Sequence, residues 1–474
     1  MNVQVEAISK EIIKPSSPTP NHLRHYKLSF LDQISPPLYT SVVLFYEFNR
    51  ETQPAITETS KHLKKSLGEV LTLFYPLAGR VKIHDHFVEC NDEGIPYLEA
   101  QVTNYRLHDV LNNLVPDELN KFIPFSLDEH IANEFAFGVQ LNMFDCGGFA
   151  IGLCISHKLA DGLSMLMFTK TWAAIARGET DEAKIGRPQF VSATLFPPKE
   201  ITGYDSHAGI TKNKVTKRFV FDASTIEDLR AKYRDLQKNE KHYRLTKHPS
   251  RVETLLAFMW RRIVGATKAD HDDDNKMHRV IYTVNLRPRI EPPLPQYSFG
   301  NICRISLTAP LLGKSSSGDD EDQESCYGMV RRVREALSKV DKDMKTLQHG
   351  GEHLRVMDRL AQSSSTGEVV TSSYTSLCQF PVYDIDFGWG RPTWVGLPPL
   401  PINDLILFLD TKEARGIEAY VTLSEEVMTK FESDPFLRRR VSMGWFGSAA
   451  DSSLIRQPLL LNHVTKFIPK SSRL

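Results

Sequence analysis

The chain carries no excess charge of either sign: its 474 residues include 58 lysines and arginines and 58 aspartates and glutamates. A protein that binds nucleic acid through phosphates needs a basic stripe or a net positive field. The balance of charge therefore argues against nucleic acid as a partner. An anionic substrate would have to meet a local cluster of positive side chains.

Cysteine pairs and long apolar runs are also missing. The six cysteines are scattered, and no CxxC pair or His/Cys spacing indicates zinc. Residues 1–15 lack the apolar core of a signal peptide, and no run of about 18 apolar residues predicts a membrane span. We therefore expect reduced cysteines in an intracellular protein without a bound metal or permanent cofactor. The acidic run HDDD at 271–274 favours a surface loop over a metal site.

Length and element order predict two domains. The chain exceeds what one hydrophobic core usually organises, and strand and helix patterns alternate in both halves, as in α/β domains. Residues 196–216 are rich in proline, glycine and polar side chains without periodicity, which is typical of a linker. We place an N-terminal domain at 1–198, the linker at 199–216, a C-terminal domain at 217–437 and an extension at 438–474.

Hydrophobic periodicity predicts several elements. Apolar residues at helical steps indicate helices at about 57–74 and 164–176, and two strand-like runs joined by a glycine-bearing turn indicate a hairpin over 138–157. Capping-box spacing predicts a helix start at Ser224. The acidic stretch 313–325 is expected to be a solvated loop.

His157 is the leading candidate for chemistry. It follows an almost wholly apolar strand, at a position where rigid scaffolds commonly present functional side chains. Asp161 lies four residues later in SHKLADG, the one HxxxD in the chain. Imidazole titrates near neutrality and can take a proton from an alcohol that attacks a thioester. On spacing alone, a strand-end histidine with a satisfied hydrogen bond is the favoured interpretation.

Longer motifs favour the catalytic interpretation of His157 over the structural one. SHKLADG, FYPLAGR, NLRPR at 285–289 and DFGWG at 386–390 resemble the plant BAHD acyltransferases, over about Ile8 to Leu437. PSSPTP, KLSFLD, FDCGG and YDIDFGWG are most similar to the vinorine-synthase branch, which includes alkaloid, capsaicinoid and fruit-ester acyltransferases. The resemblance implies an α/β fold of two chloramphenicol-acetyltransferase-like domains with mixed sheets. A channel between them would admit coenzyme A from one side and the acceptor from the other.

The resemblance also implies roles for single residues. His157 takes the place of the general base midway along the channel. Asp161 is expected to pair with Arg287 rather than to orient His157, and a His–Asp dyad is the alternative. The remaining motif residues are expected to form a turn at the domain interface, away from the chemistry: Asp386, Gly388, Trp389 and Gly390.

The segment before DFGWG departs from the family pattern. Relatives often carry threonine or serine and then tryptophan there, lining the reaction chamber, whereas Leu377 holds the tryptophan's place in this chain. Thr375 could still donate a hydrogen bond to the developing oxyanion. Without the indole N–H, the sequence does not identify a second hydrogen-bond donor to the oxyanion. The acceptor pocket should also be larger or drier than in those relatives.

A coenzyme A site is expected near the helix that starts at Ser250, beside Lys247 and Arg251. Free N–H groups and the dipole at a helix start attract phosphate, and the family places a coenzyme phosphate contact near this start. An ordinary capping box is the alternative, and the two are compatible.

The prediction is thus a monomeric acyl-CoA-dependent O-acyltransferase that forms a ternary complex with acetyl-CoA and an alkaloid or terpenoid alcohol. N-acylation, a longer acyl donor and a non-catalytic binding paralogue are the alternatives. Cytosol is the expected location. The C-terminal Ser472-Arg473-Leu474 is similar to the Ser-Lys-Leu peroxisomal address, which makes the peroxisome the alternative.

Overall fold

The computed structural model describes residues 2–47, 56–82, 86–125, 135–201, 210, 214–239, 248–267, 277–312, 319–347, 369–413 and 415–441. Three predicted features lie outside these residues: the HDDD run at 271–274, Lys247 and the C-terminal Ser472-Arg473-Leu474. Most of the predicted linker, 199–216, also lies outside them. Within the described residues, no helix is long and apolar enough to cross a membrane.

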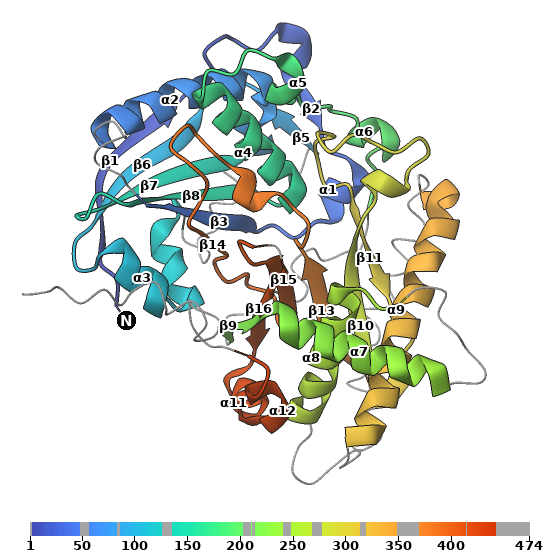
Figure 1. Cartoon of the computed structure of the whole chain (residues 1–474). Helices are drawn as coiled ribbons and strands as arrows, with labels where there is room; N and C mark the ends of the chain where they lie inside the picture. The colour runs from blue at the N-terminus through green and yellow to red at the C-terminus, as the bar shows by residue number, and fades with distance from the viewer. Residues whose placement is uncertain are drawn as a thin grey trace, which may run out of the picture.

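The first large sheet comes almost entirely from the N-terminal half of the chain (Figure 1). Its strands lie in the order β1 (Val5–Ile13), β6 (Ile95–Val102), β7 (Phe137–Phe144), β8 (Phe149–Ser156), β3 (Tyr39–Tyr46) and β14 (Trp394–Gly396). β6 and β7 are parallel, whereas β7 and β8 are antiparallel, so the sheet is mixed. The hairpin predicted over 138–157 is confirmed by β7 and β8. β14 belongs to the C-terminal half and pairs with β3, so the two halves share this sheet.

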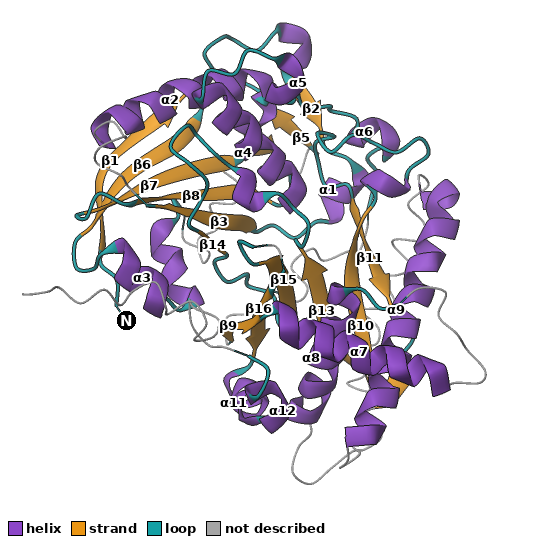
Figure 2. Ribbon diagram, in the orientation of Figure 1, coloured by secondary structure: helices purple, strands orange, loops and turns teal. Residues whose placement is uncertain are grey.

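Helices cover both faces of this sheet (Figure 2). Helices α2 (Ile56–Leu73) and α4 (Gly162–Ala176) pack on one face, and α3 (Leu107–Asn113) with the 3-10 turn η3 (Pro116–Phe122) packs on the other. α2 confirms the helix predicted at 57–74. α4 begins two residues before its predicted start at 164, because the Asp161 carboxylate caps the helix by accepting the Ser164 N–H at 2.9 Å.

The second large sheet comes from the C-terminal half. It contains β11 (Cys303–Leu307), β10 (Met277–Asn285), β13 (Val369–Ser376), β15 (Leu405–Asp410), β16 (Ile417–Leu423) and β9 (Val215–Phe221), with β12 (Leu311–Leu312) beside β10. Helices α7 (Ala223–Asn239), α8 (Arg251–Thr267) and α9 (Asp319–Leu347) lie along one face. Side chains on the other face of the sheet pack with the N-terminal core; they are Leu407, Leu409 and Tyr420. The face that α7, α8 and α9 leave uncovered is therefore turned toward the N-terminal half of the chain.

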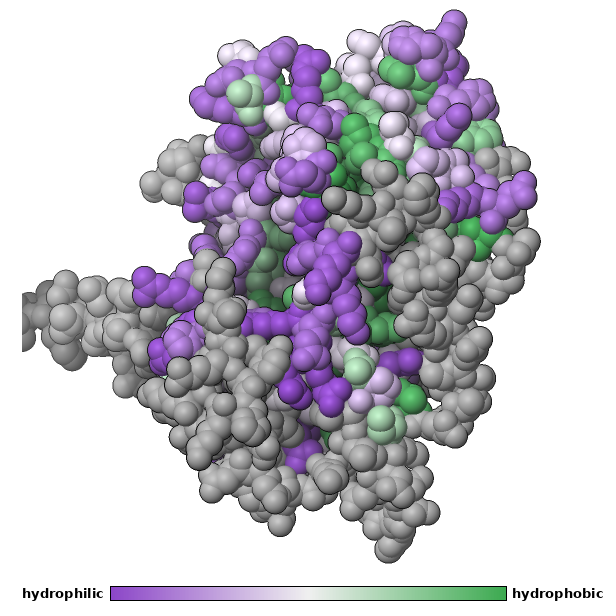
Figure 3. Space-filling view, turned by 90° about the vertical axis from the view of Figure 1, so that its right-hand side faces the viewer, coloured by the Kyte–Doolittle hydropathy of each residue, from purple (hydrophilic) through white to green (hydrophobic). Residues whose placement is uncertain are grey.

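Two smaller groups complete the fold. A three-stranded sheet contains β2 (His25–Lys27), β5 (Phe87–Glu89) and β4 (Arg80–Lys82). The short helix α1 (Phe30–Ile34) follows β2, and α11 (Glu425–Ser433) and α12 (Pro435–Arg438) follow β16. On the face shown in Figure 3, hydrophilic residues form most of the described surface and hydrophobic residues show in smaller patches between them.

Two local predictions are wrong. Asp222, rather than Ser224, caps α7: its carboxylate accepts the Thr225 N–H at 2.7 Å, so Ser224 lies inside the first turn. The acidic stretch 313–325 is not wholly a loop, because α9 begins at Asp319. Carboxylates are favourable in the first turn of a helix, where they meet the positive end of its dipole. β9 begins at Val215, and the domain boundaries themselves stay predictions.

Close packing at Gly152 of β8 gives a test of the N-terminal core. A Cβ atom added there would lie 1.9 Å from the Phe122 carbonyl oxygen, which is backbone and cannot turn aside. Gly152→Ala should therefore destabilise the protein by at least the roughly 1–3 kcal/mol typical of overpacking, measured by chemical denaturation. Gly265→Ala in α8 is the matched control: its Cβ would meet nothing within 4 Å, so the change should be neutral or stabilising. Equal stability of the two variants would contradict this packing.

Candidate active site

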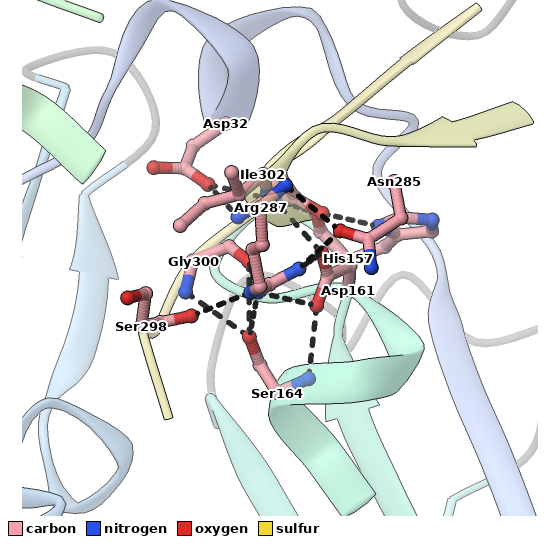
Figure 4. A network of polar contacts seen from close by, with 10 residues as sticks. Asp32, His157, Asp161, Ser164, Asn285, Arg287, Ser298, Gly300 and Ile302 are labelled. Atoms are coloured by element: carbon pink, nitrogen blue, oxygen red, sulfur yellow. Dashed lines mark hydrogen bonds and ion pairs between the residues drawn. The ribbon is translucent and has the colours of Figure 1, made fainter. Parts of the chain in front are cut away.

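His157 lies directly after β8, where a segment of the C-terminal half crosses the end of the N-terminal sheet (Figure 4). Its backbone N–H donates to the Leu38 carbonyl at 2.8 Å, which fixes the main chain. Its ring Nδ1 lies 3.0 Å from Oδ1 of Asn301. The imidazole is thus held by a residue 144 positions away in the sequence.

The orientation of the Asn301 amide determines which ring nitrogen carries the proton. Nδ2 of Asn301 donates to Oδ1 of Asp32 at 2.9 Å and to the His157 carbonyl at 2.7 Å. Oδ1 therefore faces the ring, and only a protonated Nδ1 can donate to it. In the neutral ring, Nε2 then has an unshared electron pair and can accept a proton.

The surroundings of His157 keep this ring neutral. Burial lowers the pKa of His157 below its ordinary value, and the charge of Asp161 and the hydrogen bond to Asn301 only partly oppose that effect. A histidine with a lowered pKa is unprotonated at neutral pH. His157 therefore has the charge state and the tautomer that a general base requires.

Asp161 is turned to Arg287 rather than to His157. The two Asp161 oxygens accept from the Arg287 guanidinium at 2.8 and 3.1 Å, and they also accept the N–H groups of Ser164 at 2.9 Å and Ile302 at 3.2 Å. Burial would raise the pKa of Asp161, but Arg287 and these hydrogen bonds hold it below its usual value. The contacts are those of an anchor between α4 and the segment before β11.

Arg287 is almost completely buried, with 2% of its surface exposed. Besides Asp161, its guanidinium donates to the carbonyls of Ser298 at 2.9 Å and Gly300 at 3.2 Å, and to Oγ of Ser164 at 3.0 Å (Figure 4). One arginine therefore holds the chain on both sides of Phe299. The same segment continues into Asn301. The stretch of chain that Arg287 holds in place therefore also carries the residue that contacts His157.

The DFGWG motif forms a turn packed on the N-terminal sheet. The Asp386 carboxylate accepts the N–H groups of Gly388 at 2.7 Å and Gly390 at 3.0 Å. Both glycines have a positive φ, 111° and 105°, which side chains other than glycine rarely adopt. The turn leads into β14, which pairs with β3.

The two aromatic rings of the motif face the first half of the chain. Phe387 and Trp389 stack on each other at 5.4 Å, and Trp389 meets the rings of Tyr46 and Phe149 edge-on. Phe387 also meets Trp172 of α4 edge-on. The motif thus joins the two halves of the chain through aromatic packing.

Thr375 and Leu377 lie at the end of β13, and both are half-buried. Thr375 is paired with Leu407 of β15, on the face of the sheet that is turned toward the N-terminal half. Leu377 reaches the start of α4, where a Cβ on Gly162 would lie 3.5 Å from its Cδ2. A purely apolar side chain therefore contacts the helix that begins five residues after His157.

Ser250, one of the predicted coenzyme residues, forms a capping box with Glu253 at the start of α8. The Ser250 N–H donates to Glu253 Oε2 at 2.8 Å, and the Glu253 N–H donates to Ser250 Oγ at 3.2 Å. Arg251 donates to Asp410 at 2.9 Å and to the Arg415 carbonyl at 3.0 Å. The capping box is confirmed, and a phosphate at this helix start stays a prediction.

Comparisons with known proteins identify the family. The transferase family model matches residues 3–437. The chain belongs to this family, the BAHD acyltransferases. Stemmadenine O-acetyltransferase of Catharanthus roseus is 35% identical over 441 residues, 92% of this chain and 97% of that protein. Limonoid 21-O-acetyltransferase of Melia azedarach is 36% identical over 442 residues, 92% of this chain and 97% of its own length.

Solved structures agree with the fold. The crystal structure of vinorine synthase matches with a TM-score of 0.78 at 32% identity and covers 93% of this chain and 100% of its own. TRI101 of F. sporotrichioides, solved with coenzyme A and T-2, shares the fold at 16% identity with a TM-score of 0.68, over 89% and 100% of the two chains. The family, the mixed α/β fold and the enzyme class, an acyl-CoA-dependent acyltransferase, are thereby confirmed.

No motif in the sequence indicated a role for Asn301 or Asp32. Asp32 is the last residue of KLSFLD, and neither residue has a spacing that indicates chemistry. Their contacts to each other span 269 residues, so no local pattern could reveal them. Among the described residues, no group of three or more His, Cys, Asp or Glu side chains could hold a metal.

Proposed function

We propose that this BAHD enzyme transfers an acetyl group from acetyl-CoA to a hydroxyl of a bulky alkaloid or terpenoid, with His157 as general base. The observation that carries the proposal is the orientation of the Asn301 amide, whose Oδ1 lies 3.0 Å from Nδ1 of His157, so that the neutral ring keeps its electron pair on Nε2. The names of two relatives that match most of this chain, a stemmadenine O-acetyltransferase and a limonoid 21-O-acetyltransferase, support the acetyl donor and the acceptor class.

The proposed reaction proceeds in a ternary complex. Nε2 of His157 takes the proton of the acceptor hydroxyl as its oxygen attacks the thioester carbonyl, and a tetrahedral oxyanion forms. The Thr375 hydroxyl is our candidate donor to that oxyanion. When the C–S bond breaks, the imidazolium returns the proton to the thiolate of coenzyme A. The new ester and free coenzyme A leave without an acyl-enzyme.

We propose a placement for each substrate from the residues available at the two predicted sites. We place the coenzyme phosphates near Ser250 and Arg251 at the start of α8, with Lys247 as a further candidate, because a helix start offers free N–H groups. We place the acceptor against Leu377, where the absence of an indole leaves an apolar wall suited to an alkaloid or terpenoid skeleton. The enzyme is proposed to act as a monomer.

An acceptor panel tests this function. The purified protein is incubated with acetyl-CoA and a set of alkaloid and terpenoid alcohols, each paired with its amine analogue, and products are identified by mass spectrometry. Transfer to alcohols supports the proposal. Transfer only to amines, or only from longer acyl-CoA donors offered in parallel, would replace the proposed substrates. Absence of any transfer, with acetyl-CoA binding retained, would indicate a binding paralogue.

We propose a cytosolic location, which is the expectation for the family. A fluorescent protein fused to the N-terminus, which leaves Leu474 free, should give a diffuse signal in plant cells. A second fusion, in which the fluorescent protein precedes only the last twelve residues, tests the tail by itself. Punctate signal that overlaps a peroxisomal marker in both fusions would instead establish Ser472-Arg473-Leu474 as a working address.

A further inference from the structure

We propose that Asp32 is a positioning residue for catalysis: its carboxylate fixes the orientation of the Asn301 amide and, through it, the tautomer of His157. This inference rests on the proposed role of His157 as general base. It assigns a function to a carboxylate that belongs to the short helix α1, far from both of the other residues in the sequence.

Each oxygen of the Asp32 side chain accepts two hydrogen bonds. Oδ1 accepts the backbone N–H of Asn301 at 3.0 Å and its side-chain Nδ2–H at 2.9 Å. Oδ2 accepts the N–H and the hydroxyl of Ser29, both at 2.7 Å. Three of these four donors are N–H groups, which cannot accept in return, so a protonated Asp32 could donate only to the Ser29 hydroxyl. The site is therefore an acceptor site, and an ionised carboxylate satisfies it at both oxygens.

This carboxylate is held in the interior. Asp32 and Ser29 are 0% exposed, and Asn301 is 1% exposed. Burial raises the pKa of Asp32, and the hydrogen bonds from Ser29 and Asn301 act against that rise. The nearby cation is Lys158, which directly follows His157 and donates to the Gln33 carbonyl at 2.8 Å. Burial lowers the pKa of Lys158 to about 8, and the charge of Asp32 opposes that effect.

An asparagine cannot specify the tautomer of a histidine by itself. Its amide can turn by 180°, exchanging an acceptor for a donor of nearly the same shape. The orientation observed here has two acceptors on the Nδ2 side, the Asp32 carboxylate and the His157 carbonyl. A hydrogen bond to a charged acceptor is roughly twice as strong as one between neutral groups. Asp32 thus contributes more than the His157 carbonyl to the preference of the Asn301 amide for the observed orientation.

The orientation of the Asn301 amide decides whether Nε2 of His157 can act as a base. If the Asn301 amide turned, Nδ2–H would face Nδ1 of His157, which would then have to accept. The neutral ring would carry its proton on Nε2, where it could not take the proton of an alcohol. In a serine protease triad, loss of the correctly charged carboxylate produces the wrong histidine tautomer and a loss of about 10⁴-fold in kcat. In this chain the Asp32 carboxylate contacts Asn301, and Asn301 in turn contacts the His157 ring.

The test observes the tautomer directly and needs no acceptor. The protein is labelled with ¹⁵N-histidine, and the ring nitrogens are followed by long-range ¹H–¹⁵N NMR above the pKa of His157. The His157 signals are assigned by their loss in His157→Gln. Wild-type protein should show Nδ1 protonated and Nε2 unprotonated in more than about nine-tenths of molecules. Asp32→Ala, which removes both acceptors, should raise the Nε2–H form to half or more.

Two further variants keep the test decisive. Gln33→Ala is the matched control on α1: it removes hydrogen bonds to the Lys199 backbone at 3.1 and 2.9 Å but leaves Asp32 untouched, so the tautomer should not change. Asp32→Asn serves if the alanine variant does not fold. Its amide meets a donor whichever way it turns, so the Nε2–H form should rise at least several-fold.

Each outcome separates the two proposals. An Nε2–H tautomer in the wild-type protein, or a wild-type tautomer ratio in a folded Asp32 variant, would overturn the role of Asp32. Those results do not depend on catalysis. Full activity of a His157 variant would refute the general base instead and would leave the tautomer measurement valid. In the active enzyme, the Asp32 variants should lower kcat by roughly 10²-fold with KM for acetyl-CoA little changed, since Asp32 contacts Ser29 and Asn301 and not the residues proposed to bind the coenzyme phosphates.

Discussion

His157→Ala should lower kcat by roughly 10²-fold or more, because a positioned general base contributes about 10²–10⁴ to the rate of proton transfer. The remaining rate would come from proximity of the two substrates in the ternary complex. KM for acetyl-CoA should change little. The measurement is initial-rate kinetics with acetyl-CoA and the best alcohol of the panel, with far-UV circular dichroism and a thermal melt to establish that the variant is folded.

His22→Ala provides the matched control. His22 is an exposed residue of the 3-10 turn Asn21–Leu23 in the N-terminal half of the chain. Its replacement should leave turnover within about 2-fold of wild type, since surface substitutions rarely disturb the fold. A folded His157→Ala protein with turnover close to that of the control would exclude His157 as the base.

Local elements were predictable where one hydrophobic pattern determined them. The β7–β8 hairpin and α2 have runs of apolar residues whose period is decided within 20 residues of sequence, and both elements form where they were expected. Helix ends were harder to place. Serine and aspartate are both favourable N-cap residues, so the sequence alone does not decide between Ser224 and Asp222. In the structure the Thr225 N–H donates to Asp222, which makes Asp222 the cap.

The environment of His157 could not be predicted from sequence in the same way. HxxxD and the family resemblance pointed to His157 and to the pairing of Asp161 with Arg287. The residues that set the tautomer come from α1 and from the segment before β11, and the fold alone brings them to the end of β8. Their side chains have no period and no motif spacing, because they satisfy three-dimensional hydrogen-bond geometry rather than a repeating surface.

Asp161→Ala and Arg287→Ala should each destabilise the protein strongly, by about 3–5 kcal/mol, because each leaves a buried charge without its partner. Arg287 would keep only neutral acceptors, the carbonyls of Ser298 and Gly300 and the hydroxyl of Ser164. Asp161 would keep two backbone donors. The measurement is the free energy of unfolding from urea titration, in a range where unfolding is reversible.

The pH dependence of this effect has a definite sign. Arg287 holds the pKa of Asp161 below its ordinary value, so the pair stabilises the folded state fully above the unfolded-state pKa, about 3.9 for aspartate. That contribution is lost as the pH falls through the lower folded-state value. The cost of Asp161→Ala should therefore be largest near neutrality.

The double variant distinguishes the anchor from a His–Asp dyad. If Asp161 and Arg287 stabilise the protein by pairing with each other, Asp161→Ala/Arg287→Ala should be less destabilised than the sum of the single variants, by a coupling energy of about 1–3 kcal/mol. The folded fraction of Asp161→Asn, which keeps the shape of the side chain, should retain substantial kcat because Asp161 does not touch the imidazole. An Asp161 variant that melts like wild type and is as inactive as His157→Ala would support the dyad, since its loss would then lie in the chemistry and not in the anchor.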